Sequence, residues 1–157
     1  MSIQKLNKVE GYRGYIFTRK INGNFIPHRV QNLVIKDFAK RKNFFFKLSL
    51  TEYVMEGSYL TLGALVKETK KLEGVIFYSY EMIFDNVAYC EDILLKIVKN
   101  KKSIHFALEE FHVKNKTDIK NLLKIIQIKK NSTNFVENNN LKKILNIKKK
   151  LNVWTSI

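Results

Sequence analysis

Short apolar runs alternate along the chain with stretches in which apolar residues recur every three or four positions. The short runs are rich in β-branched and aromatic residues, which favour strands, and they lie at 11–18, 44–49, 75–79 and 104–109. The helical stretches lie at 30–41, 59–72, 86–100 and 117–130. Strands that alternate with helices are typical of a parallel sheet with helical crossovers. The pattern predicts a three-layer α/β fold with a mostly parallel sheet of four to five strands.

Turn and cap residues mark the ends of these elements. Pro27 suits the first turn of a helix, because the N–H that it lacks has no partner there. Ser58 is a candidate N-cap for the second helix, and Asp85 or Asn86 for the third. Gly74 separates the second helix from the strand that follows it.

The C-terminal part of the chain has a different composition. Residues 131–140 are polar and read as a linker, and residues 141–151 carry a lysine-rich helical pattern. We therefore expect a single α/β domain over 1–130 and a lysine-rich helical tail over 131–157.

The net charge of +15 raises the question of nucleic acid. Lysine supplies 25 of the 29 basic residues and arginine only four, whereas proteins that read bases favour the bidentate arginine fork. A codon bias toward lysine, with the lysines on solvent-exposed faces, explains the positive charge more simply. A nucleic-acid partner is therefore not expected.

The cysteine count and the length of the apolar runs indicate in which cellular compartment the protein is expected. Cys90 is the only cysteine, which excludes an internal disulfide framework and suits a reducing cytoplasm. The longest apolar runs are far shorter than the roughly 20 residues of a spanning helix. The start of the chain also lacks the apolar stretch of a secretory signal. A cytoplasmic protein that does not insert into a membrane is the expectation.

Polar residues gather where the predicted strands end. In open parallel sheets, ligands collect beyond the carboxyl ends of the strands. The residues expected there, together with those at the start of the first helix, are Thr18, Arg19, His28, Arg29, Gln31, Asn32, Glu52, Tyr53, Ser79 and Glu109. A helix N-terminus with arginine nearby favours a phosphate or a carboxylate. We therefore expect one crevice that binds an anionic ligand.

Glu52 and Glu109 from this set, together with His105, could move protons in such a crevice. Glu52 could act as a general base if it is desolvated, and His105 could transfer a proton with Glu109 as its orienting group. Each also has a structural interpretation: an exposed loop carboxylate for Glu52 and a hydrogen-bonded core histidine for His105. These three residues are the catalytic candidates.

Aromatic and hydroxyl side chains complete the predicted binding set. Tyr15, Tyr53 and Tyr59 could stack on a sugar or a base, although packing is the simpler role for any one of them. Ser58 is a further binding candidate besides its capping role.

The sequence predicts no cofactor and no metal. The glycines of 11–14 precede a strand instead of joining a strand to a helix, so they are not a dinucleotide fingerprint, and a Walker lysine pattern is missing. The three histidines form no i, i+4 pair and one cysteine cannot build a zinc site. Hydride transfer and ATP hydrolysis are therefore disfavoured.

Five motifs stand in a familiar order: 11–16 (GYRGYI), 26–34 (IPHRVQNLV), Glu52-Tyr53, 57–59 (GSY) and 105–109 (HFALE). Together they resemble the sporadic carbohydrate cluster protein family, over about residues 11–125. The resemblance implies a role in bacterial surface-polysaccharide biosynthesis, such as lipopolysaccharide or capsule. The family's name records the genes that lie nearby, so it implies no mechanism.

The layout is also similar, at the level of the fold, to the resolvase-like catalytic domain of serine recombinases, and it is flavodoxin-like in its strand and helix order. Two departures argue against DNA cleavage. The serine nucleophile expected after the first strand is replaced within Tyr15-Ile16-Phe17-Thr18-Arg19, and the Asp-Arg pair expected after the third strand is absent. Arginine would stabilise the charge of a phosphoryl-transfer transition state.

The leading hypothesis is a cytoplasmic protein that binds or converts an anionic sugar intermediate, a nucleotide sugar or a sugar acid, by metal-free acid–base chemistry. If it is an enzyme, it would be an isomerase, an epimerase or a lyase. One alternative is a non-catalytic scaffold or regulator of a neighbouring biosynthetic enzyme, and another is a nucleic-acid-binding relative of resolvases. A homo-oligomer is compatible with each of them.

Overall fold

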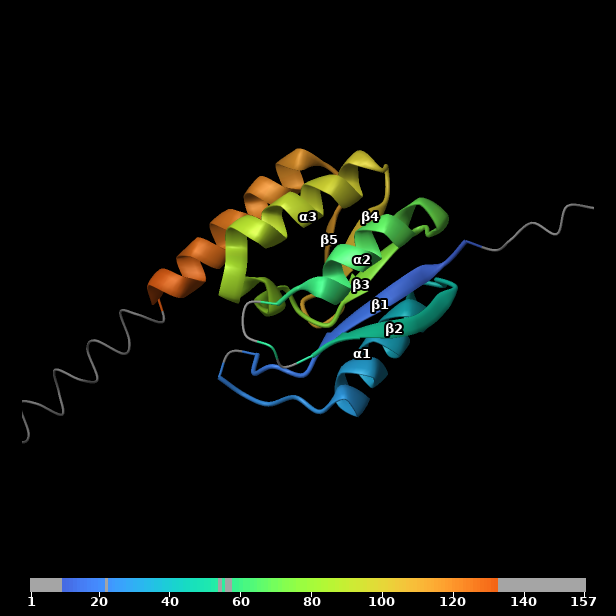
Figure 1. The fold of residues 1–157 in the computed structure, drawn as a ribbon, viewed down its shortest axis with the longest axis horizontal. Coiled ribbons are helices and arrows are strands. Elements are labelled where there is room, and N and C mark those ends of the chain that lie inside the picture. The colour runs from blue at the N-terminus through green and yellow to red at the C-terminus, as the bar shows by residue number, and fades with distance from the viewer. Residues whose placement is uncertain (1–9, 22, 54, 56–57, 133–157) are drawn as a thin grey trace, which may run out of the picture. The chain divides into compact units, whose positions relative to one another are not determined.

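A computed structural model describes residues 10–21, 23–53, 55 and 58–132 of the chain (Figure 1). The chain divides into two compact units, Met1–Ile119 and Lys120–Ile157. The predicted tail over 131–157 lies outside the described residues, apart from its first two positions. The sheet and every site discussed below belong to the first unit.

One five-stranded sheet forms the middle layer, in the order β2-β1-β3-β4-β5. The parallel strands are β1 (Tyr12–Phe17), β2 (Phe46–Glu52), β3 (Gly74–Phe77) and β4 (Ser103–Phe106). β5 (Phe111–Val113) runs antiparallel to β4. The predicted α/β class and the mostly parallel sheet are confirmed. The pattern did not reveal β5, since three residues are too few to show a period.

Helices cover both faces of this sheet (Figure 1). α1 (His28–Arg41) lies on one face, and α2 (Leu60–Glu68) and α3 (Val87–Lys99) lie on the other. Two short 3₁₀ segments, η1 (Thr69–Lys71) and η2 (Tyr80–Asn86), adjoin α2 and α3, and residues 116–132 are helical. No helix within the described part of the chain is long and apolar enough to cross a membrane.

The alternation of side chains along β1 determines which residues can share a site. Arg13 pairs with Glu68 of α2 at 3.1 Å, and the ring of Phe17 lies near that of Tyr59, which precedes α2. Ile16 instead lines a groove with residues of α1. Successive side chains of a strand point to opposite faces. Tyr12, Gly14 and Ile16 therefore face α1, whereas Arg13, Tyr15 and Phe17 face α2.

The helix starts agree with the sequence in two cases and differ in one. α1 begins directly after Pro27, and the side chain of Asn86 caps α3 by accepting from the amide of Tyr89 at 3.1 Å. α2 begins at Leu60 after Tyr59, so Ser58 is not its cap. Instead, Glu52 at the end of β2 accepts hydrogen bonds from the first-turn amides of Thr61 (3.2 Å) and Leu62 (3.0 Å).

A β-bulge interrupts β2 beside β1. Arg13 pairs with Lys47 but Tyr15 pairs with Leu50, so two residues, Leu48 and Ser49, oppose Gly14. A bulge adds a residue to one strand and redirects its side chains. Gly14 permits this arrangement, because a Cβ atom there would lie 2.1 Å from the Oγ of Ser49.

Candidate functional site

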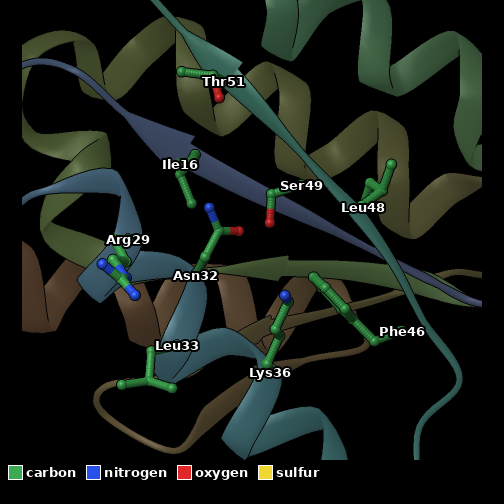
Figure 2. A pocket seen from close by; sticks show the side chains of 9 residues that line it. All are labelled: Ile16, Arg29, Asn32, Leu33, Lys36, Phe46, Leu48, Ser49 and Thr51. Atoms are coloured by element: carbon green, nitrogen blue, oxygen red, sulfur yellow. The ribbon is translucent and has the colours of Figure 1, made fainter.

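A groove of about 620 Å³ runs between α1 and the edge strand β2, over β1 (Figure 2). α1 contributes four side chains, β2 contributes four and β1 contributes one. The lining residues are Ile16, Arg29, Asn32, Leu33, Lys36, Phe46, Leu48, Ser49 and Thr51. We call this the α1–β2 groove.

Two cations border the α1–β2 groove. Arg29 and Lys36 are both exposed and both lie on the side of α1 that faces β2. Neither forms an ion pair within the part of the chain that the structure describes, and no carboxylate lines the groove. The groove is therefore positively charged without an internal counterion.

Neutral polar groups lie between these cations. Figure 2 shows the amide of Asn32 and the hydroxyl of Ser49 pointing toward one another across the groove, with the hydroxyl of Thr51 further along β2. The Oγ atom of Ser49 is buried and has no hydrogen-bond partner among the described residues. Such a group is costly to bury unless something bonds to it, so it is available to a ligand or to water.

Apolar surface completes the lining. Ile16 is almost fully buried at the base of the groove, and Phe46 is half-buried. Leu33 and Leu48 are 68% and 75% exposed. A concave surface with apolar walls and a few convergent polar groups is typical of a small-molecule site. The cations can attract an anionic group, and the amide and hydroxyls can form hydrogen bonds with neutral polar groups.

Two of the predicted site residues, Arg29 and Asn32, lie in this groove. The groove is also lined by residues that the sequence pattern did not predict, namely Lys36, Phe46, Ser49 and Thr51. Arg29, Asn32 and Lys36 are spaced i, i+3 and i+7, which places them on one side of a helix and could have been noticed. The bulge that turns Ser49 into the groove leaves no such signal, because it depends on the pairing of β2 with β1.

Glu52 lies in a different environment, on the α2 side of the sheet. Its side chain is 2% exposed and accepts from the hydroxyl of Tyr15 at 2.9 Å as well as from the two α2 amides. Burial, followed by the neighbouring carboxylate of Glu52, raises the pKa of Tyr15. Thr18 donates to the main-chain oxygen of Glu52 at 2.7 Å. These hydrogen bonds join β1, β2 and α2. Glu52, Tyr15 and Thr18 therefore stabilise the fold in this structure.

Arg19 and Tyr59 lie on this side as well. The guanidinium carbon of Arg19 is 4.2 Å from the ring centre of Phe17 and 4.4 Å from that of Tyr59. Both residues are buried, at 8% and 4% exposure. Cation–π contacts on two rings hold this arginine within the fold.

Gln31 and His28 come from the start of α1. Gln31 is fully buried: its side-chain oxygen accepts from the amide of Phe17 at 3.0 Å, and its nitrogen donates to the carbonyl oxygens of Phe17 and Ile26, both at 2.7 Å. It therefore closes the end of β1 onto α1. His28 is half-buried and is not among the groove residues.

Ser79 and Glu109 form a pair beyond the ends of β3 and β4. The hydroxyl of Ser79 donates to the carboxylate of Glu109 at 2.5 Å, and the amide of Tyr80 donates to the same carboxylate at 3.3 Å. Burial raises the pKa of Glu109, against the lowering effect of these hydrogen bonds. Ser79 is fully buried, so a ligand would have to displace its surroundings to reach it.

His105 lies on the α1 side of the sheet, among the rings of Tyr12, Phe38 and Phe44. Its Nε2 atom is 3.1 Å from the hydroxyl of Ser103, and Glu109 bonds to Ser79 instead. Burial, with smaller effects from His112, Lys114 and Lys42, lowers the pKa of His105 to about 4. Ser103 therefore orients this histidine in place of the expected Glu109.

The structure does not bring the predicted residues into one crevice. Arg29 and Asn32 face the α1–β2 groove, whereas Arg19 and Glu52 lie across the sheet from it. Tyr53 is 70% exposed after β2, and Ser58 is half-buried before α2. Within the described ranges, no group of three or more His, Cys, Asp or Glu side chains is placed to hold a metal.

Comparison with known proteins shows a similarity at the level of the fold. No protein-family model and no curated protein matches the chain. Among solved structures, the chain is similar to the N-terminal catalytic domain of TP901-1 integrase, with a TM-score of 0.51 and 17% identity. The match covers 76% of this chain and 97% of that domain. The fold resembles a serine recombinase catalytic domain.

Proposed function

We propose that this chain binds an anionic sugar derivative, a nucleotide sugar or a sugar acid, in the α1–β2 groove. One observation carries the proposal: Arg29 and Lys36 border a groove that has no carboxylate among the described residues. They lie beside the Asn32 amide and the Ser49 hydroxyl, which has no hydrogen-bond partner in the same part of the chain. Charge-assisted hydrogen bonds to an anion are the strong ones, and the neutral groups suit the hydroxyls of a sugar.

The resemblance of the five sequence motifs to the sporadic carbohydrate cluster family supports the same ligand class. It also favours a role in surface-polysaccharide biosynthesis, and the single Cys90 suits a reducing cytoplasm. The described residues of the groove offer hydrogen bonds and positive charge, which support binding. Isomerisation, epimerisation or elimination through Glu52, His105 and Glu109 remains a prediction of the sequence.

A thermal-shift screen tests the proposal, with titration calorimetry for any ligand found. Nucleotide sugars and sugar acids should raise the melting temperature, and neutral sugars should raise it less. Arg29→Ala should weaken binding by about 10-fold or more, because a hydrogen bond to a charged group contributes roughly 1.5–3 kcal/mol. Ser49→Ala should lessen the preference for a sugar over a plain phosphate or carboxylate.

Lys40→Ala is the matched control, since Lys40 is an exposed α1 lysine that does not line the groove. It should leave affinity unchanged. Equal affinities for the wild type, Arg29→Ala and Lys40→Ala would contradict the proposal. A failure of every sugar to bind, with stable co-purification of a biosynthetic enzyme, would instead favour the scaffold alternative.

A further inference from the structure

Lysines concentrate at a second surface, away from the α1–β2 groove. Three shallow depressions lie around the C-terminal end of α3, and they share lining residues: Lys96 and Lys99 join the first to the second, and Val98 and Lys114 join the first to the third. The depressions therefore form one continuous surface, which we call the lysine face. Its residues come from α2, η1, the position before β3, α3 and the loop that follows it, the start of β4 and the segment after β5.

The charge of the lysine face is strongly unbalanced. Eight lysines line it, against two acidic residues, Asp92 and Glu73. Asp92 pairs with Lys96, and Lys102 pairs with Glu10 at 3.1 Å. The other six lysines are exposed and form no ion pair within the described part of the chain.

The backbone favours diffuse attraction over a specific phosphate site here. α2 and α3 reach this face with their C-terminal ends. At the helix that begins with Lys116, the carboxylate of Asp118 accepts from the amides of Lys114 and Asn115, and the side chain of Asn115 accepts from the amide of Asp118. No arginine and no aromatic side chain from residues 10–21, 23–53, 55 or 58–132 lines it. Proteins that read or stack nucleic-acid bases use those two residue types. Flexible ammonium groups on apolar stems, with Val66, Leu95 and Val98 between them, suit a layer of separate phosphate headgroups.

Lys101 has an uncommon backbone conformation at this surface. Its φ of 58° lies in the left-handed region, directly after the end of α3, where glycine is the favoured residue. The backbone strain of a lysine at this position persists although glycine would relieve it.

From this charge, backbone and composition, we propose that the lysine face docks the protein onto an anionic phospholipid bilayer, without insertion. Each lysine near such a surface contributes about a five-fold gain in partitioning at low salt. Neutral bilayers offer no comparable attraction, and salt screens the interaction.

Vesicle co-sedimentation of the full chain tests this proposal. Vesicles with phosphatidylglycerol should retain the protein, and vesicles of phosphatidylcholine should not. The variant Lys70→Glu/Lys99→Glu/Lys101→Glu should lower partitioning by about 100-fold or more, since three attractive charges are lost and three repulsive ones are gained. The control Lys20→Glu/Lys40→Glu changes exposed lysines outside the face and should have a much smaller effect.

Lys101→Gly separates docking from folding. It should raise the melting temperature by about 2–4 °C, because glycine adopts the left-handed conformation without strain. It should nevertheless lower partitioning by about five-fold. Partitioning of the triple variant equal to that of the wild type would overturn the proposal. So would binding to duplex DNA that the triple variant abolishes while vesicle binding is unchanged.

Discussion

Individual residues show how burial changes the role that a side chain can take. Glu52 reads as a candidate base in the sequence, yet three hydrogen bonds from the hydroxyl of Tyr15 and the α2 amides occupy it. The sequence permits a catalytic and a structural interpretation of His105, and its position among aromatic rings beside Ser103 agrees with the structural one. A general base must be able to reach a substrate proton, and neither side chain has that access in this structure.

The lowered pKa of His105 predicts a loss of stability in acid. The unfolded chain takes up the proton near the ordinary pKa of about 6.5, whereas the native state takes it up only near 4. As the pH falls through that window, the unfolded state binds more protons and the native state loses on the order of 2 kcal/mol. His105→Gln should remove most of this loss of folding stability at low pH, as measured by urea unfolding at several pH values. His112→Gln, at an exposed position, should change the profile much less.

Among the elements, the bulge of β2 links local geometry to the α1–β2 groove. The extra residue places both Leu48 and Ser49 beside Gly14, and Ser49 then points into the groove. Phe46 also lies close to Gly14. The groove therefore depends on the pairing of two strands that α1 separates in the sequence.

Gly14→Ala should destabilise the protein by about 1–3 kcal/mol, because the new methyl group would overlap Ser49. Ser49→Gly in the same chain should recover about 1 kcal/mol or more of that loss, since it removes two of the three close contacts. Denaturant unfolding of the two single variants and the double variant measures this coupling. Purely additive effects would show that the bulge does not form as described.

For the whole first unit, the two proposed surfaces occupy separate parts of the fold. The α1–β2 groove lies at the β2 edge, whereas the lysine face is built from α2, α3 and the β4 and β5 ends, and the two share no residue. Substitutions at sites with no shared partners usually add. Arg29→Ala should thus leave vesicle partitioning nearly unchanged, and the triple lysine variant should leave the affinity for a sugar ligand unchanged. Coupling between the two assays would show that both ligands compete for one surface.

The sequence alone determined the succession of strands and helices, because hydrophobic period and cap residues are local signals. It also predicted Arg29 and Asn32 as binding residues, and both line the groove from one side of α1. Only the tertiary structure decided which face of the sheet each residue meets. Tyr15 and Ile16 are neighbours in the chain, yet one bonds to Glu52 beneath α2 and the other lines the groove beside α1. The alternation of a strand separates adjacent residues by the thickness of the sheet, and the order of the strands brings distant residues together.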